Sequence, residues 1–174
     1  AAEESARGRY DDAIALYRYL DDYKDSKKKV SQTQTAKQEA MYSRAAECVE
    51  NEEFDKAIEL YQQLGDYKDS AEKIGQTETE KLNNSNYKRA AEYFENKWYN
   101  NAIELYKQLG DYRDSKDKAE QVQAAKQEDM YDRAAEYMNK KQYVNAIPLY
   151  RQLSGYKDSD EKLESIYNLA GEYV

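Results

Sequence analysis

Pairs of aspartates spaced three residues apart are the groups in this chain most suited to chemistry. Asp66 precedes Asp69, and Asp111 precedes Asp114. Carboxylates of this kind bind calcium, but a calcium loop also needs oxygens at alternate positions and a central glycine, which both segments lack. The second aspartate of each pair precedes another acidic residue by three positions, as Asp114 precedes Asp117, which is the spacing of a helix capping box. We therefore expect helix capping, and no metal or other cofactor.

The other side chains of catalytic sites are scarce in this sequence. The chain has no histidine to serve as a general base or metal ligand, and it has one cysteine. It carries no glycine-rich phosphate loop, and no serine stands in the setting of an activated nucleophile. We therefore expect that the protein is not an enzyme.

A repeated motif organises the chain. Ala-Ile-x-Leu-Tyr starts at residues 13, 57, 102 and 146, in steps of 44, 45 and 44 residues, and Leu-x-x-Tyr-Lys/Arg-Asp-Ser follows each copy. Ala-Ala-Glu marks units that start near Ala1, Ala45, Ala90 and Ala134, and a partial unit starts near Ala170 after a step of 36. Repeats of this length stack into solenoids, so we expect residues 1–174 to form a single array.

The composition and local signals predict an all-α chain of alternating long and short helices. One proline and six glycines leave few helix breakers. We predict a long helix over 70–95, and tight turns at 52–54, 97–99 and 141–143. Short helices should begin near Asp55, Asn100 and Val144 and end before Gly65, Gly110 and Ser154. Residues 83–86, Asn-Asn-Ser-Asn, are the weakest helical segment, where we expect a bend or split.

Charge narrows the possible partners. The net charge is −8, and no basic stripe interrupted by aromatic residues is present, so we expect no nucleic-acid partner.

No apolar run approaches the roughly 20 residues of a membrane span, so we expect no membrane insertion. The sequence indicates no cellular compartment.

The cysteine and the tyrosines fall in repeated positions. Cys48 stands where later units have Tyr93 and Tyr137, so we expect a buried small hydrophobic residue, with a reactive thiol as the alternative. Eighteen of the nineteen tyrosines occupy five such columns, and only Tyr19 stands outside. Because these tyrosines recur from unit to unit, we expect them to pack between helices. The alternative is that they form an aromatic platform for a ligand.

The pattern resembles a tetratricopeptide repeat. Tyr87, Ala90, Tyr93, Tyr99, Ala102, Ile103, Tyr106 and Leu109 follow the alternation of small and aromatic residues of that family. Gly8 matches the turn glycine of the family. The period of 44 to 45 residues, longer than the family's 34, and the missing terminal proline depart from it. The Leu-Gly-Asp-Tyr-Lys-Asp-Ser ending looks like a variety common in bacterial surface and regulatory proteins. The resemblance implies a right-handed superhelix whose concave groove holds peptides or partner helices.

The resemblance also implies which residues face that groove. One tyrosine column and a second apolar column lie on the same side of the first helix of each unit: Tyr42, Tyr87 and Tyr131, with Val49, Phe94 and Met138. At two neighbouring positions the side chain differs in charge or polarity from unit to unit: Ser43, Lys88 and Asp132, with Glu50, Glu95 and Asn139. These residues could determine which ligand binds. Exposure of polar side chains to solvent explains them equally well.

Trp98 is the one indole, and it stands in a turn where other units carry Arg9, Glu53 and Gln142. Tryptophan is enriched at binding hot spots, and packing over a neighbouring unit is the alternative.

These features favour a non-catalytic scaffold that binds a protein or peptide. The alternative is a structural subunit that joins further copies of itself end to end, as an array or filament.

Overall fold

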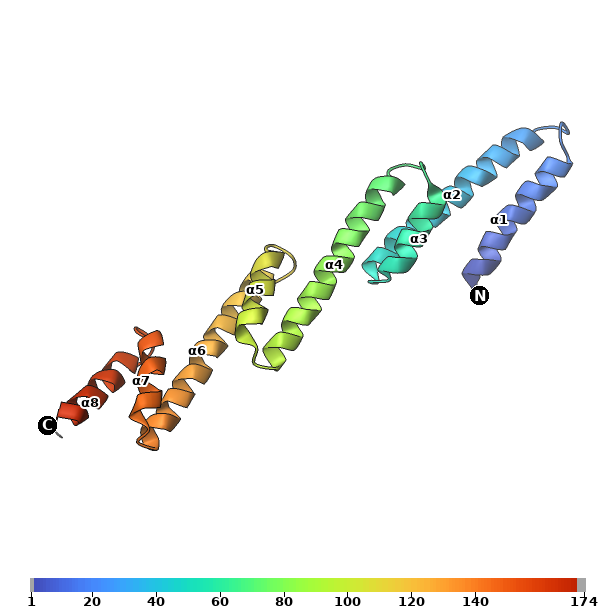
Figure 1. Ribbon diagram of the computed structural model, residues 1–174. Coiled ribbons are helices and arrows are strands. Elements are labelled where there is room, and N and C mark those ends of the chain that lie inside the picture. The colour runs from blue at the N-terminus through green and yellow to red at the C-terminus, as the bar shows by residue number, and fades with distance from the viewer. Residues whose placement is uncertain (1, 172–174) are drawn as a thin grey trace. The chain divides into compact units, whose positions relative to one another are not determined.

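The computed structural model of the chain describes residues 2–171, with side chains from Arg9 to Leu169, and helices joined by short turns make up these residues. Eight helices and no strand occupy these residues, which confirms the predicted all-α class (Figure 1). The helices are α1 (Ala2–Tyr19), α2 (Ser26–Glu50), α3 (Phe54–Leu64), α4 (Ser70–Glu95), α5 (Tyr99–Leu109), α6 (Ser115–Asn139), α7 (Tyr143–Gln152) and α8 (Ser159–Gly171).

Long and short helices alternate as predicted, and α4 has the predicted bounds. The short helices α3, α5 and α7 begin one residue earlier than expected, at an aromatic residue. Each tight turn before them contains a non-glycine residue in the left-handed region, with φ of 59° at Glu52, 59° at Lys97 and 57° at Lys141. Gly65 and Gly110 end α3 and α5 with a φ of 58°, a conformation that glycine adopts without steric cost.

The chain divides into two compact units, residues 1–82 and 83–174. The division falls inside α4, at the first residue of the segment 83–86, where the sequence predicts a weak helix. The helix assignment nevertheless continues through this segment.

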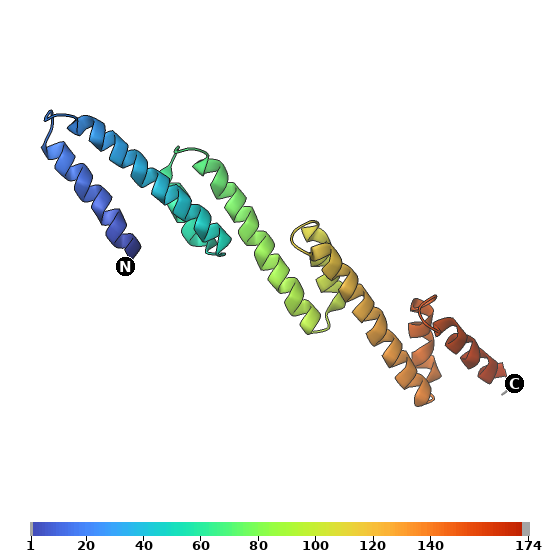
Figure 2. The ribbon, with the colours of Figure 1, turned by 180° about the vertical axis from the view of Figure 1, so that it is seen from behind.

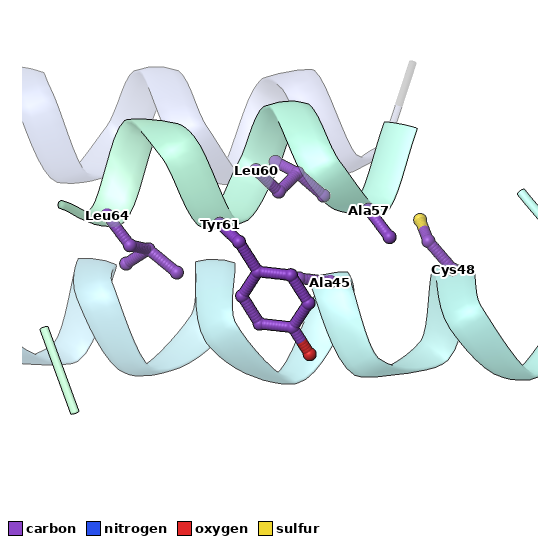
Figure 3. Packing of buried hydrophobic residues seen from close by; sticks show 6 residues of the cluster. All are labelled: Ala45, Cys48, Ala57, Leu60, Tyr61 and Leu64. Carbon is purple, nitrogen blue, oxygen red and sulfur yellow. The ribbon is translucent and has the colours of Figure 1, made fainter. Parts of the chain in front are cut away.

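In the first unit, α2 packs against both α1 and α3. Both ribbon views show α1 lying beside α2, with the turn between them at one end (Figures 1 and 2). The core joins Ala45 and Cys48 of α2 to four apolar residues of α3, and Ile74 of α4 packs against it. In Figure 3 the Tyr61 ring lies across Ala45, and Ala57 faces Cys48. The small residues let the two helices approach closely, and Tyr61 fills the remaining space.

The second unit repeats this arrangement twice. Ala90, Ala102 and Tyr106 centre one core, between α4, α5 and α6, and Ala134, Ala146 and Tyr150 centre another, between α6, α7 and α8. Helices that follow one another in sequence pack together, as in a helical repeat solenoid.

Two predictions concern the ends of the chain: a turn at Gly8, which the structure corrects, and a partial unit from Ala170, which the described residues include only in part. Helix α1 runs without interruption through Gly8, so no turn forms at the residue that matched the family's turn glycine. Strong helix formers precede it, and a single glycine costs a helix only about 1 kcal/mol relative to alanine. Of the partial unit predicted from Ala170, residues 172–174 lie outside the described residues.

Candidate interaction surface

A group of three tyrosines recurs at the junctions between long and short helices. The Tyr42 ring meets Tyr61 edge-on, with ring centroids 5.7 Å apart, and meets Tyr67 in the same way at 6.4 Å. Such edge-to-face contacts stabilise packed aromatic rings beyond the area that they bury. We call these groups the tyrosine triads: Tyr42, Tyr61 and Tyr67; Tyr87, Tyr106 and Tyr112; Tyr131, Tyr150 and Tyr156.

The first tyrosine of each triad donates its hydroxyl hydrogen to an aspartate of the following turn. Tyr42 donates to Asp69 at 2.5 Å, and Tyr87 and Tyr131 donate to Asp114 and Asp158. Because an ionised phenol cannot donate, these bonds raise the pKa of each of the three tyrosines to about 12. The same bonds lower the pKa of the three aspartates.

These bonds correct the prediction of capping boxes. Asp114 stands at the N-cap of α6, yet its side chain makes no capping bond, because its carboxylate instead accepts the hydroxyl of Tyr87. Asp111 is paired with Lys116 at 2.5 Å. Within the described residues, no group of three or more acidic or cysteine side chains is placed to hold a metal ion.

A basic residue covers each triad. Lys68 adopts a φ of 52°, and its Nζ lies 4.7 Å from the ring centroid of Tyr42 and 5.6 Å from that of Tyr67. This placement allows cation–π attraction to both rings. Arg113 and Lys157 repeat the left-handed backbone and the position over two rings. The left-handed turn therefore aims the basic side chain in each full repeat.

A carboxylate completes two of the three groups. Glu39 accepts hydrogen bonds from Tyr67 at 2.7 Å and from Lys68 at 2.6 Å, and these bonds lower its pKa. Glu128 does the same for Tyr156 and Lys157. The corresponding position beside the second triad holds Asn84, a buried and uncharged residue. The sequence analysis did not predict the three tyrosine–aspartate hydrogen bonds. The constant separation of 27 residues between each tyrosine and its aspartate was a signal for them.

The predicted groove residues fall into two classes. The aromatic and apolar ones are half-buried and pack against the cores: Tyr42, Val49, Tyr87, Phe94, Tyr131 and Met138. The polar ones are exposed: Ser43, Glu50, Lys88, Glu95, Asp132 and Asn139. Each long helix thus presents polar groups to solvent beside a column of tyrosines that already bond within their own unit.

Trp98 forms the exposed part of an aromatic cluster at the turn between α4 and α5. Its indole lies 5.5 Å from the ring of Tyr93 and is 57 % exposed. Phe94 and Tyr99 form a separate ring pair at the same turn, with centroids 6.2 Å apart. The Trp98 backbone N–H donates to the Tyr93 carbonyl at 2.8 Å, so the turn holds the indole on a fixed support. The corresponding residues Glu53 and Gln142 offer no such aromatic surface.

A hollow in the first unit lies where α1, α2 and α3 meet. It has a volume of about 650 Å³, and it is lined mainly by polar side chains, including Arg18, Gln34 and Gln38. Lys37 and Asp11 also line it and are paired with each other at 2.5 Å. A polar, open hollow whose charges already neutralise one another offers little to a small apolar ligand.

Cys48 is buried among these helices. It is 4 % exposed, burial raises the pKa of its thiol, and its Sγ donates to Oε2 of Glu53 at 3.6 Å. A protonated thiol is a poor nucleophile. The structure therefore confirms the prediction of a buried small residue at this position.

No described helix is both long enough and apolar enough to cross a membrane. Comparison with protein-family models, with curated proteins and with solved structures finds no match to this chain.

Proposed function

We propose that this chain is a non-catalytic scaffold, similar to a tetratricopeptide repeat, that binds a peptide or a helix of a partner protein. The observation that carries the proposal is the exposed indole of Trp98, which packs against the ring of Tyr93. A tryptophan held by a neighbouring ring presents a large apolar surface that loses little conformational freedom on binding, which is the character of a binding hot spot.

The exposed polar residues of the same helix would select the ligand. Lys88 and Glu95 are exposed on α4, and Glu95 lies three residues before Trp98. Their counterparts differ in the other long helices, where Ser43 and Glu50 or Asp132 and Asn139 take these places. Charge at the rim of an apolar contact determines which partners bind more than it raises affinity.

The state of the reactive groups supports binding without chemistry. Asp69, Asp114 and Asp158 accept tyrosine hydroxyls and have lowered pKa values, so they are poor proton carriers near neutral pH. The thiol of Cys48 is buried and protonated. These groups hold helices together, and the scaffold would act through its surface alone.

The test is selection of peptides from a random library on the immobilised whole chain, followed by titration of each selected peptide in solution. Trp98 is the only tryptophan, so its emission reports directly whether a peptide contacts the turn. We expect Trp98→Gln, which installs the residue found at position 142, to weaken the selected peptides about tenfold or more, as for a hot-spot residue. Its melting temperature should stay that of the parent chain.

The matched control is Gln142→Ala, which alters the corresponding turn and should leave peptide affinity unchanged. Glu95→Lys and Lys88→Glu test the polar rim, because reversing a charge should change which peptides are selected. Peptides that bind Trp98→Gln and the parent chain equally, with unchanged selection on both charge variants, would contradict the proposal.

A further inference from the structure

Helix α1 exposes apolar residues whose equivalents in the other repeats are buried or half-buried. Leu16 is 66 % exposed and Leu20 is 45 % exposed, whereas Leu60 and Leu64, at the same positions one repeat later, are 5 % and 6 % exposed. Tyr19, at 90 %, and Tyr23, at 60 %, extend the face. The spacing of these four residues places them on one side of the helix and its following turn.

The first unit shows what covers the corresponding face. Leu60 and Leu64 belong to the core cluster between α2 and α3 that includes Ala45, which lies one turn after Tyr42 on α2 (Figure 3). The covering helix therefore carries Tyr-x-x-Ala, with the alanine allowing close approach and the tyrosine reaching the turn. Tyr87 with Ala90 and Tyr131 with Ala134 repeat this sequence in the second unit.

The turn after α1 already has the form that receives such a tyrosine. Tyr23-Lys24-Asp25 corresponds to Tyr67-Lys68-Asp69, and Lys24 has the same φ of 52° as Lys68. The Nζ of Lys24 lies 5.2 Å from the ring centroid of Tyr23, as Lys68 lies over Tyr67. Asp25 stands at the N-cap of α2, and its carboxylate makes no capping hydrogen bond to that helix.

A fourth copy of Tyr-x-x-Ala, from Tyr167 to Ala170, lies in α8. In the sequence, Tyr167-Asn-Leu-Ala170 aligns with Tyr131-Asp-Arg-Ala134. The side chain of Tyr167 is 46 % exposed, whereas Tyr42, Tyr87 and Tyr131 are half-buried in their triads. Arg151 donates a hydrogen bond to the Tyr167 oxygen, which leaves the hydroxyl hydrogen able to bond an acceptor.

We propose that the α1 face and its Tyr23-Lys24-Asp25 turn bind α8 of a second copy of this chain. In this contact Tyr167 donates to Asp25, Lys24 covers the Tyr167 ring, and Leu16 and Leu20 become buried. The contact completes a fourth tyrosine triad between copies, with Tyr167, Tyr17 and Tyr23. It joins two different surfaces, so it is heterologous, and further copies add in the same direction. The inference is independent of the scaffold function, because it involves neither Trp98 nor the polar residues around it.

Sedimentation velocity of the whole chain across a concentration series tests the contact. The average mass should rise with concentration. Leu20→Glu should weaken association about tenfold or more, because it places a charge in the contact. The matched control is Val144→Glu, since Val144 is an apolar residue of α7 that is 84 % exposed and lies outside the proposed contact. It should associate like the parent chain.

A mixing experiment tests whether the contact is heterologous. Leu20→Glu keeps α8 intact, and Tyr167→Ala keeps the α1 face intact, so each variant alone should be monomeric. Their equimolar mixture should form dimers and nothing larger, because one intact surface of each kind remains. Tyr167→Phe removes only the hydroxyl and keeps the ring, so it should weaken association less than Tyr167→Ala. Because the ring is kept, weaker association of this variant does not reflect a folding defect.

A parent chain that stays monomeric at every concentration overturns the proposal. Equal weakening by Leu20→Glu and Val144→Glu overturns it as well, and so does a mixture of the two variants that remains monomeric. Peptide binding that depends on Trp98 can persist through any of these results, so failure of the contact is distinguishable from failure of the scaffold function.

Discussion

The hydroxyl of Tyr42 donates a 2.5 Å hydrogen bond to Oδ1 of Asp69, and so ties α2 to the turn that leads into α4. The two residues are 27 positions apart, and short helix α3 lies between them in sequence. One bond therefore joins the beginning and the end of a helix–turn–helix unit. Because it lowers the pKa of Asp69 and raises that of Tyr42, it makes the unit sensitive to both acid and alkali.

Tyr106 tests the contribution of the buried triad member. Its side chain is 2 % exposed, and it contacts Tyr87 edge-on at 5.5 Å. Tyr106→Ala should lower the free energy of unfolding by about 3–5 kcal/mol, as for other emptied aromatic sites. Urea denaturation followed by circular dichroism measures this loss. Tyr19→Ala, at a position 90 % exposed, is the control and should change stability by less than about 0.5 kcal/mol. Similar losses for both variants would show that Tyr106 is not a core residue.

Stability should fall on both sides of a broad neutral range. The three triad tyrosines have folded pKa values of about 12 against an ordinary value of 10.0, so their contribution is complete below pH 10 and is lost as the pH rises through 12. Their aspartate partners have pKa values below the ordinary 3.8, so that contribution is present above pH 3.8 and is lost as the pH falls further. Urea midpoints measured across this pH range should trace both losses.

Tyr87→Phe isolates one of these bonds. Without the hydroxyl, the variant should be less stable than the parent at neutral pH, and the difference should shrink in strong alkali and strong acid. Tyr19→Phe serves as the control, because Tyr19 lies outside every triad and is 90 % exposed. A difference between Tyr87→Phe and the parent that is constant with pH would show that Asp114 does not depend on this hydroxyl.

Two glycines should respond in opposite ways to the same substitution. Gly75 lies inside α4, and Gly110 ends α5 with a φ of 58°; a Cβ at either position would meet no atom within 4 Å. Gly75→Ala should therefore stabilise the chain by about 1 kcal/mol through helix propensity. Gly110→Ala should destabilise it by about 1 kcal/mol, because alanine is strained in the left-handed region. Thermal unfolding of the two variants compares them directly, and a shift of the same sign in both would contradict the explanation.

Cys48 should resist thiol reagents in the folded chain. It is 4 % exposed within the core between α2 and α3, and burial raises the pKa of its thiol. Alkylation at mildly alkaline pH should be slow in buffer and rapid in concentrated urea, where the core is lost. Mass spectrometry after a timed pulse of iodoacetamide measures both rates. Rapid labelling without urea would show that the core opens locally.

Most of the fold could be predicted because each signal recurs. Four copies of one motif placed the long helix 70–95 correctly and placed each short helix to within one residue at its start. The turn that the family pattern implied at Gly8 was wrong, because such a pattern indicates where glycine is allowed and not whether the helix continues through it. In the structure the helix continues.

The candidate site was less predictable than the fold. Sequence spacing made Asp114 a helix cap, because local spacing cannot show that a hydroxyl 27 residues away competes for the same carboxylate. The predicted groove positions separated into half-buried and exposed residues only when the partners of each side chain were known. The exposure of Leu16 and Leu20 was also invisible in the sequence, since their repeat equivalents are buried or half-buried.

The tyrosine triads also bear on how such a chain changes length during evolution. Each full repeat carries a donor tyrosine on its long helix, and an acceptor aspartate 27 residues later in the next turn. Duplication or loss of one complete period in the gene therefore joins a donor to an acceptor of the same kind at every new junction. No compensating substitution is required, so recombination between repeats can lengthen or shorten the protein while each junction keeps its chemistry.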